Sequence, residues 1–404
     1  MPAAWIQALS ELEDFISATP EVQITNEVVT LPDSVRPQFY RYFNNVRAAF
    51  IAEKFSVEIE QARELAVHFG AARETMCQKL ELEDIEIGSR MRQFFETPGV
   101  CLERLLFDPL FEVVKHKLEK DQFEKRSTDA INELFTNLFH TGYNLWVTMS
   151  IINAVDPSAA FIVPMPDNRT EPDLTDAEHV PGGGLARVPA LEKPVKVSFE
   201  HIPFTALLVP RIIVHSRKLA CFLSFRTDYH DVYRRDDSFK DPGKWTNTID
   251  LWRKYGKNDL WPDIGIYIGT SADELSLVAD YSHVVKPQLL VESMDRVDWH
   301  EKRVPAVNRH HEISQPPAGG FVVCREPVDA GVMQRLKPVP MAVPETVSAE
   351  GVMLESLEAQ TVVAPDPLAL SEGISILEVG YDSAGIEPVV HALLAFRNTL
   401  STCP

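Results

Sequence analysis

Three carboxylates in the second half of the sequence could take part in hard-cation chemistry. Asp263 opens one apolar stretch of strand-like composition, Glu292 lies within a later one, and Asp280 stands between them. Divalent cations such as Mg²⁺ and Mn²⁺ prefer carboxylate oxygens, and hydrolysis of a phosphodiester needs cation charge on the oxyanion that develops. We therefore take Asp263, Asp280 and Glu292 as candidate catalytic residues, with Asp263 and Glu292 as candidate metal ligands. Mg²⁺ or Mn²⁺ is the only cofactor that this pattern implies.

The neighbours of these carboxylates carry a resemblance to a known family. Pro262-Asp263 precedes the first stretch, and Glu292-Ser293-Met294 continues the second. Together with an earlier pair of strand-like stretches, Val209 to Val214 and Ala220 to Arg226, the region 205–294 resembles the restriction-endonuclease-like superfamily, whose signature is PD…(D/E)xK. The resemblance implies a sheet in which the Asp and the Glu bind a cation while the Lys positions the attacking water.

Both copies of the signature are incomplete. In the earlier copy, Arg211 and Ser224 stand where the Asp and the Glu should be. In the later copy, Met294 replaces the Lys, and Lys286 or Lys302 would substitute only if the fold brings one of them back. A core of this kind would keep the fold and lose the metal, so the sequence leaves enzymatic activity undecided.

A basic segment flanked by acidic ones is a second candidate for binding. Residues 211–257 contain eleven Lys and Arg against six Asp, a net +5, whereas residues 338–404 contain one Arg against nine acids, a net −8. Aromatic residues are interleaved with the basic ones, as in proteins that hold single strands by phosphate contacts and base stacking. The candidate nucleic-acid-binding residues are Arg226, Arg234, Arg235 and Lys254.

Two observations weigh against nucleic acid. The formal net charge of −20 argues against a surface coated for nonspecific nucleic-acid binding. A solvated mixed-charge loop, or a helix packed by its Trp residues, explains the same interleaved composition. The sequence also leaves open whether the acidic tail masks the basic segment.

Other chemistries find less support. His283, His300, His310, His311 and Glu312 offer transition-metal ligands, but neighbouring residues of an extended segment point to opposite sides, so His310 and His311 would not bind one ion. The five cysteines are far apart and form no Cys-x-x-Cys pair, which favours buried free thiols. The sequence contains no Gly-x-Ser-x-Gly elbow and no dinucleotide fingerprint.

The spacing of apolar residues divides the chain into regions. Over the first 160 residues they recur every three or four positions, as in helices packed in a bundle. Pro and Gly then gather, and short runs rich in Val, Ile, Leu and Phe follow, which predict strands. The predicted organisation is a helical domain at 1–160, a Pro/Gly-rich linker at 161–194, a mixed α/β, nuclease-like domain at 195–325, a flexible acidic Pro-rich segment at 326–372, and a C-terminal strand and helix at 373–404.

The fold class is therefore multi-domain α plus α/β, with an N-terminal helical domain, a mixed α/β sheet domain and an acidic, partly flexible C-terminal region. The predicted helices are Trp5 to Phe15, Gln38 to Phe55, Ile59 to Leu80, Cys101 to Leu118, Ile131 to Ile152, Trp245 to Tyr255 and Glu387 to Leu400. The predicted strands are 195–199, 206–214, 219–225, 264–268, 275–279, 288–291, 321–323 and 374–379.

Two function classes follow from these observations. The first is a noncatalytic interaction or scaffold protein with a degenerate nuclease-like domain, in which the helical domain binds a protein partner. The second is a divalent-metal-dependent nuclease or nucleic-acid-binding protein that uses Asp263, Asp280, Glu292 and the basic residues 226–235. The incomplete motifs and the acidity favour the first class. Because no opening segment joins a basic start to an apolar run, we expect a soluble cytoplasmic protein without membrane contact.

Overall fold

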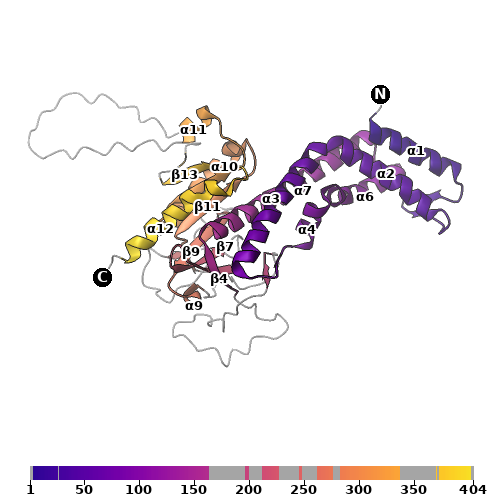
Figure 1. Cartoon of the computed structure of the whole chain (residues 1–404). Helices are drawn as coiled ribbons and strands as arrows, with labels where there is room; N and C mark the ends of the chain where they lie inside the picture. The colour runs from indigo at the N-terminus through magenta and orange to yellow at the C-terminus, as the bar shows by residue number, and fades with distance from the viewer. Residues whose placement is uncertain are drawn as a thin grey trace, which may run out of the picture. The chain divides into compact units, whose positions relative to one another are not determined.

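The computed structural model describes residues 3–25, 27–162, 196–199, 212–226, 245–247, 262–275, 283–336, 370 and 373–401. These residues form two compact units. The first holds residues 3–153 and the short strand at 196–198, and the second holds the rest. The chain is thus multi-domain, with a helical N-terminal region and a mixed sheet with helices, as the sequence predicts (Figure 1).

The first unit is built from helices whose apolar residues recur with helical spacing. Its helices are α1 (Ala4–Ala18), α2 (Arg36–Lys54), α3 (Ser56–Leu80), α4 (Ser89–Glu96), α5 (Pro98–Glu103), the 3₁₀ turn η1 (Arg104–Leu106), α6 (Phe107–Val114) and α7 (Lys120–Ala154). Its short strands are β1 (Gln23–Ile24), β2 (Val29–Thr30), β3 (Asp84–Glu86) and β5 (Lys196–Ser198). In the part of the chain that the structure describes, no helix is long and apolar enough to cross a membrane.

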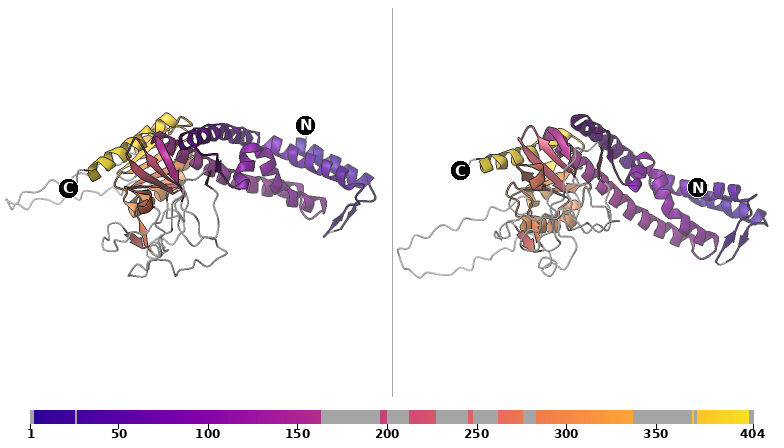
Figure 2. Two further views of the ribbon diagram at one scale, coloured as in Figure 1. Left: turned by 60° about the horizontal axis from the view of Figure 1, so that its bottom comes forward. Right: turned by 90° about the horizontal axis from the view of Figure 1, so that it is seen from below.

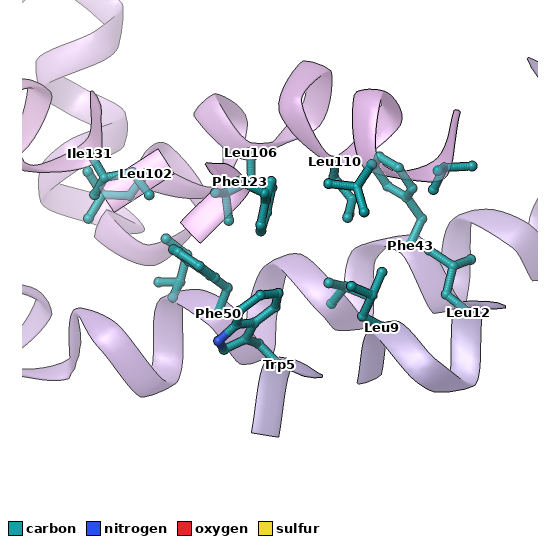
Figure 3. Close-up of a cluster of buried hydrophobic side chains, with 14 of the residues drawn as sticks. Trp5, Leu9, Leu12, Phe43, Phe50, Leu102, Leu106, Leu110, Phe123 and Ile131 are labelled. Atoms are coloured by element: carbon teal, nitrogen blue, oxygen red, sulfur yellow. The ribbon is translucent and has the colours of Figure 1, made fainter. Parts of the chain in front are cut away.

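An aromatic core holds one end of this unit together. Trp5 of α1 lies 5.4 Å from Phe50 of α2 and 5.6 Å from Phe123 of α7, measured between ring centroids. Leu and Phe side chains of α1, α2, α6 and α7 fill the space around these rings (Figure 3). Because each fully buried side chain of this size contributes about 1.5–3 kcal/mol, this core is the main reason that these helices associate.

Polar contacts fix the far end of α7 against α3. Lys79 donates from Nζ to the carbonyl oxygen of Asn153, 2.7 Å away, and the Asn153 amide donates to the carbonyl of Ala72. A cation at the last carbonyls of a helix is favoured by the helix dipole. These bonds hold the last turn of α7, which ends at Ala154.

The second unit contains a seven-stranded mixed sheet with the order β13-β12-β11-β9-β7-β6-β4. Within this sheet, the neighbours β4, β6, β7, β9 and β11 are antiparallel to one another, whereas β11, β12 and β13 are parallel. The sheet strands are β4 (Pro157–Phe161), β6 (Ile212–Ser216), β7 (Cys221–Arg226), β9 (Ile264–Gly269), β11 (Leu289–Met294), β12 (Gly320–Cys324) and β13 (Ile374–Glu378). The remaining elements of this unit are β8 (Trp245–Asn247), β10 (His283–Val285), α9 (Ala272–Leu275), α10 (Trp299–Ser314), α11 (Ala330–Leu336), η2 (Ser383–Ile386) and α12 (Glu387–Ser401).

Helices cover both faces of this sheet. Helix α10 connects the parallel strands β11 and β12, and it buries Val304 and Val307 in one apolar cluster with Met294, Val322 and Cys324. Helix α12, drawn in yellow, runs along the sheet in Figures 1 and 2, and its Glu387 pairs with Lys218 beside the β6–β7 turn. The charge of Arg397 on α12 acts on Cys221, whose side chain points to the face opposite that of Met294. The sheet therefore lies between α10 on one face and α12 on the other.

Most of the predicted helices are confirmed, and one is divided. The segment predicted as one helix from Cys101 to Leu118 is α5, η1 and α6 in the structure. Pro109 lacks the N–H that would continue the helix through the preceding turn, so the chain starts a new helix there.

Four predictions in the second unit differ from the structure. Trp245–Asn247 is strand β8 rather than the start of a helix, since it pairs with β10, and Leu275 ends helix α9 rather than opening a strand. Helix α10 was not predicted, because Pro305 interrupts its pattern and most of its residues are polar. Helix α11 lies in the segment predicted to be flexible, and its Leu336 is buried.

The unit boundary also lies elsewhere than the predicted one at residue 160. It falls between Asn153 and Ala154, because β4 pairs with β6 as an edge strand of the second unit's sheet. The C-terminal strand and helix belong to that same unit, as β13 and α12. Of the linker predicted at 161–194, Phe161 ends strand β4, and residues 163–194 lie outside the described residues.

Close helix packing at Gly142 yields a testable prediction. A Cβ at this position of α7 would lie 2.9 Å from Leu65 of α3 and 3.1 Å from Phe95 of α4, whereas a Cβ at Gly70 of α3 would meet nothing within 4 Å. We expect Gly142→Ala to destabilise the first unit by about 1–3 kcal/mol through overpacking. The matched Gly70→Ala should stabilise it by about 0.5–1 kcal/mol, since Ala is the better helix former. Urea denaturation followed by ellipticity would check both, and equal effects of the two substitutions would contradict the packing.

Candidate functional site

Asp263 and Glu292 come together at the centre of the second unit's sheet. The β9–β11 register pairs Ile264 with Val291, so the next pair outward places Asp263 opposite Glu292. Directly opposed residues of antiparallel strands point to the same face. The two carboxylates therefore face the same side, toward α10, as the later copy of the signature requires.

Helix α10 supplies two positively chargeable groups to these carboxylates. Arg303 and His310 are seven residues apart, which is two helical turns, so both lie on the face that packs on β11. Arg303 places Nη2 3.2 Å from Oδ1 of Asp263 and 3.4 Å from Oε2 of Glu292. The Nδ1 of His310 lies 2.6 Å from Oε1 of Glu292. We call these four residues the buried charge cluster.

The buried charge cluster is largely closed to water. The side chains of His310 and Glu292 are 0% and 3% exposed, that of Asp263 is 12% exposed, and that of Arg303 is 33% exposed. Asp263 also accepts a hydrogen bond at Oδ2 from the backbone N–H of Ser293, 2.8 Å away. That bond holds the Asp263 carboxylate against β11.

Burial controls the protonation of Glu292. Loss of water raises the pKa of its carboxyl, and the nearby Asp263 charge raises that pKa further. Contact with His310 and the charge of Arg303 oppose this rise. The pKa of Glu292 lies above its ordinary value, because two positive groups do not fully replace the hydration that a buried carboxylate has lost.

The residues of this site do not fit a divalent cation. The Arg303 guanidinium lies between the two carboxylates, within reach of both, in the space that a shared cation would need. Met294, at the position of the signature Lys, is buried in the apolar cluster under α10. Lys286 donates to Gln315, and Lys302 is exposed on α10. Among the described residues, no three His, Cys, Asp or Glu side chains are grouped as a metal ion would require.

Three of the four histidine candidates lie on a helix, not on the extended segment that the sequence suggested, and His283 belongs to β10. His300, His310 and His311 all belong to α10. Consecutive helical residues point about 100° apart, so His310 faces Glu292 while His311 packs beside Gly320 and Gly373. Burial lowers the pKa of His311. Glu312 is exposed, so these residues form no metal site together.

The earlier copy of the signature forms a strand pair without acids. Ser224 of β7 is buried and pairs with Ile213 on one side and Tyr267 on the other, and it stands where the resemblance calls for Glu. The side chain of Arg226 is not described, although its backbone belongs to β7. The described residues do not include Arg211 of the earlier copy or the candidates Arg234, Arg235, Lys254 and Asp280.

The described cysteines are unsuited to nucleophilic chemistry. Cys101, Cys221 and Cys324 are buried and Cys77 is half-buried, and all four are free thiols, as the sequence predicts. Burial raises the pKa of the Cys221 thiol to about 11 and that of Cys324 to about 12. At neutral pH both are therefore protonated, and the thiol is a poor nucleophile in that form.

Sequence reasoning identified Asp263 and Glu292 but not the residues that neutralise them. The sequence motifs assign no role to Arg303, and they present His310 only as a metal ligand beside His311. The signal that could have found them is the spacing of Arg303, Val307 and His310 at i, i+4 and i+7, which marks one face of a helix.

Comparisons of the chain with protein-family models, with curated proteins and with solved structures give no match.

A pair of arginine substitutions tests whether the buried charge cluster is required for stability. Arg303→Ala leaves two carboxylates without their shared cation, and we expect a loss of about 2–4 kcal/mol, somewhat below the loss at a fully buried pair because Arg303 is partly exposed. The exposed Arg296 pairs only with Asp298, so Arg296→Ala should change stability by less than about 1 kcal/mol. Urea midpoints of the second unit check both, and a loss at Arg303 as small as that at Arg296 would mean that water solvates the carboxylates.

Proposed function

We propose that this protein is a noncatalytic interaction protein. In this proposal the second unit is a degenerate nuclease-like domain, and the helical first unit binds a protein partner. The observation that carries it is the position of Arg303, whose Nη2 lies 3.2 Å from Asp263 and 3.4 Å from Glu292. A tethered guanidinium thus lies where a cation shared by these two carboxylates would have to bind.

The strand arrangement supports the nuclease-like part of the proposal. Pro262 and Asp263 directly precede β9, Glu292 lies on the neighbouring β11, and a helix follows β11. This is the placement of Asp and Glu that the resemblance implies. Met294 occupies the Lys position and is buried among apolar side chains, where a lysine would lose its hydration. In this proposal the core keeps its arrangement and has lost its chemistry.

Charge supports a protein as the partner. A formal net charge of −20 repels polyanions such as nucleic acids and anionic membrane surfaces at long range. The first unit presents helices, and helical faces are a common means of protein–protein recognition. Val57 and Val67 of α3 are 65% and 70% exposed, so this helix offers apolar side chains to a partner.

A cation titration tests the noncatalytic proposal. A cation that binds the folded protein at one hundred times its Kd would stabilise it by about 2.7 kcal/mol. We expect Mg²⁺ and Mn²⁺ to leave the urea midpoint of the second unit unchanged, and the protein to leave DNA and RNA of either strandedness uncut. Stabilisation by Mn²⁺ that disappears in Glu292→Gln but persists in the control Glu301→Gln, an exposed carboxylate on α10, would refute the proposal.

The nucleic-acid alternative has its own measurement. Binding of a labelled oligonucleotide, followed by fluorescence anisotropy, would be compared between the natural protein and Arg234→Ala/Arg235→Ala. Binding through phosphates weakens steeply as salt rises. We expect no salt-dependent binding in either protein, and affinity that falls with salt and with the double substitution would establish the alternative.

A further inference from the structure

A short strand from far along the chain pairs with the first unit. Strand β5 lies parallel to β3, although their residues are about 110 positions apart in the sequence. One residue beyond the last pair, the N–H of Phe199 donates to the carbonyl oxygen of Glu86, 2.8 Å away. In the described part of the chain, β3 and β5 form a two-stranded sheet. The edge of β3 is therefore a place where the helical unit receives an extended segment.

The pairing of these two strands buries one side chain from each. Ile85 of β3 and Val197 of β5 stand opposite each other and are 1% and 0% exposed. Successive residues of a strand point to opposite sides, so Lys196 and Ser198 point away from this contact. Lys196 is indeed exposed. Within β5, Val197 is thus the side chain that attaches the strand to the interior of the unit.

The outer side of β3 is acidic and faces a lysine. Residues 81–86 contain four acids. Lys196 places Nζ 3.9 Å from Oε1 of Glu86, and its charge also acts on the carboxylate of Asp84, which is paired with Arg73 of α3. Water screens such partly exposed contacts, so they add little stability. Their effect is on selectivity, because an acidic residue opposite these carboxylates would be repelled.

The contacts of β5 are few enough to be reversible. A parallel pair of strands is less stable per residue than an antiparallel one, and two strands alone are only marginally stable in water. Because the chain itself tethers β5 to the unit, its pairing with β3 is an intramolecular event. A segment that pairs only weakly as a free peptide therefore still occupies the edge of β3.

We propose that the edge of β3 is a strand-addition site for a protein partner, and that residues 196–199 occupy it until the partner displaces them. In strand addition, main-chain hydrogen bonds give affinity and the alternate side chains give specificity. The partner presents an extended segment in which a basic residue precedes a β-branched apolar one, as Lys196 precedes Val197. The inference rests on the proposed function, because it names where the first unit binds its protein partner.

A fluorescent peptide that copies residues 194–200 is the probe, and anisotropy measures its binding to the full chain. Val197→Asp should release β5, because a charge is costly at this buried position. A site that is free in about one molecule in ten binds about tenfold more weakly than one that is always free. We therefore expect Val197→Asp to bind the peptide at least about tenfold more tightly than the natural protein does. The matched control Val28→Asp, at a 57% exposed position of the same unit, should bind it as the natural protein does.

A second pair of variants releases β5 without changing the buried contact. Phe199→Pro removes the N–H that bonds to Glu86, whereas Phe199→Ala removes the same ring and keeps that N–H. We expect the proline variant to bind the peptide about two- to tenfold more tightly than the alanine variant, as the loss of one hydrogen bond implies. This pair decides the question if Val197→Asp does not fold.

Changes in the peptide test the chemistry of the partner. Val197→Asp within the peptide should abolish its binding, and Lys196→Glu within the peptide should weaken it. The exposed Glu86 allows the charge to be reversed. When Glu86→Lys is added to the Val197→Asp protein, the peptide with Lys196→Glu should bind better than the natural peptide.

Peptide binding that is absent from both releasing variants, or equal in each releasing variant and its control, would overturn the inference. That result would leave the proposed function in place, because the exposed valines of α3 remain available to a partner. The proposed function fails on a separate measurement, the stabilisation of the second unit by Mn²⁺, which does not depend on the peptide.

Discussion

A carboxylate enclosed in a protein must either be neutralised or lose its charge, and this requirement governs the centre of the second unit. Glu292 is 2% exposed and lies on a strand with neighbours on both sides, so water cannot solvate it. Arg303 and His310, both on α10, contact this carboxylate. The position of α10, the connection from β11 to β12 and the packing of their apolar cluster all follow from where these groups must stand.

The buried charge cluster also determines the register of the sheet. A shift of β11 by one residue would turn Glu292 to the opposite face and bring Ser293 toward α10. The apolar side chains on either side, Leu290 and Met294, would tolerate several arrangements, because hydrophobic contact has no direction. Buried ion pairs often contribute little net stability compared with apolar replacements of the same volume. The buried charge cluster therefore acts on register: it disfavours every other register of β11, because each would bury a charge without a partner.

The sequence was sufficient for those features that depend on local patterns. The helices of the first unit repeat their apolar residues with helical spacing, and β9, β11, β12, β13 and α12 are bounded by clear signals. The sequence was insufficient where an element forms only by pairing with a segment far away in the chain. Strand β8 forms by pairing with β10, whose partner residues are 36 to 40 positions later in the chain, which no local preference of Trp245 reveals. Helix α10 contains Pro305 and a polar stripe, which obscure the helical spacing of its buried residues.

The same requirement explains why two neighbouring acids need not bind a metal. Asp263 and Glu292 contact the same guanidinium, so replacing either one changes the charge that surrounds Arg303. Loss of Glu292 would also remove the carboxylate that Nδ1 of His310 contacts. Two acids at the spacing of a metal site are therefore not evidence of a metal when a helix delivers a fixed cation between them. A metal site and a structural charge cluster differ in the positive group that stands between the two acids. In this protein that group is Arg303, a side chain of the protein itself.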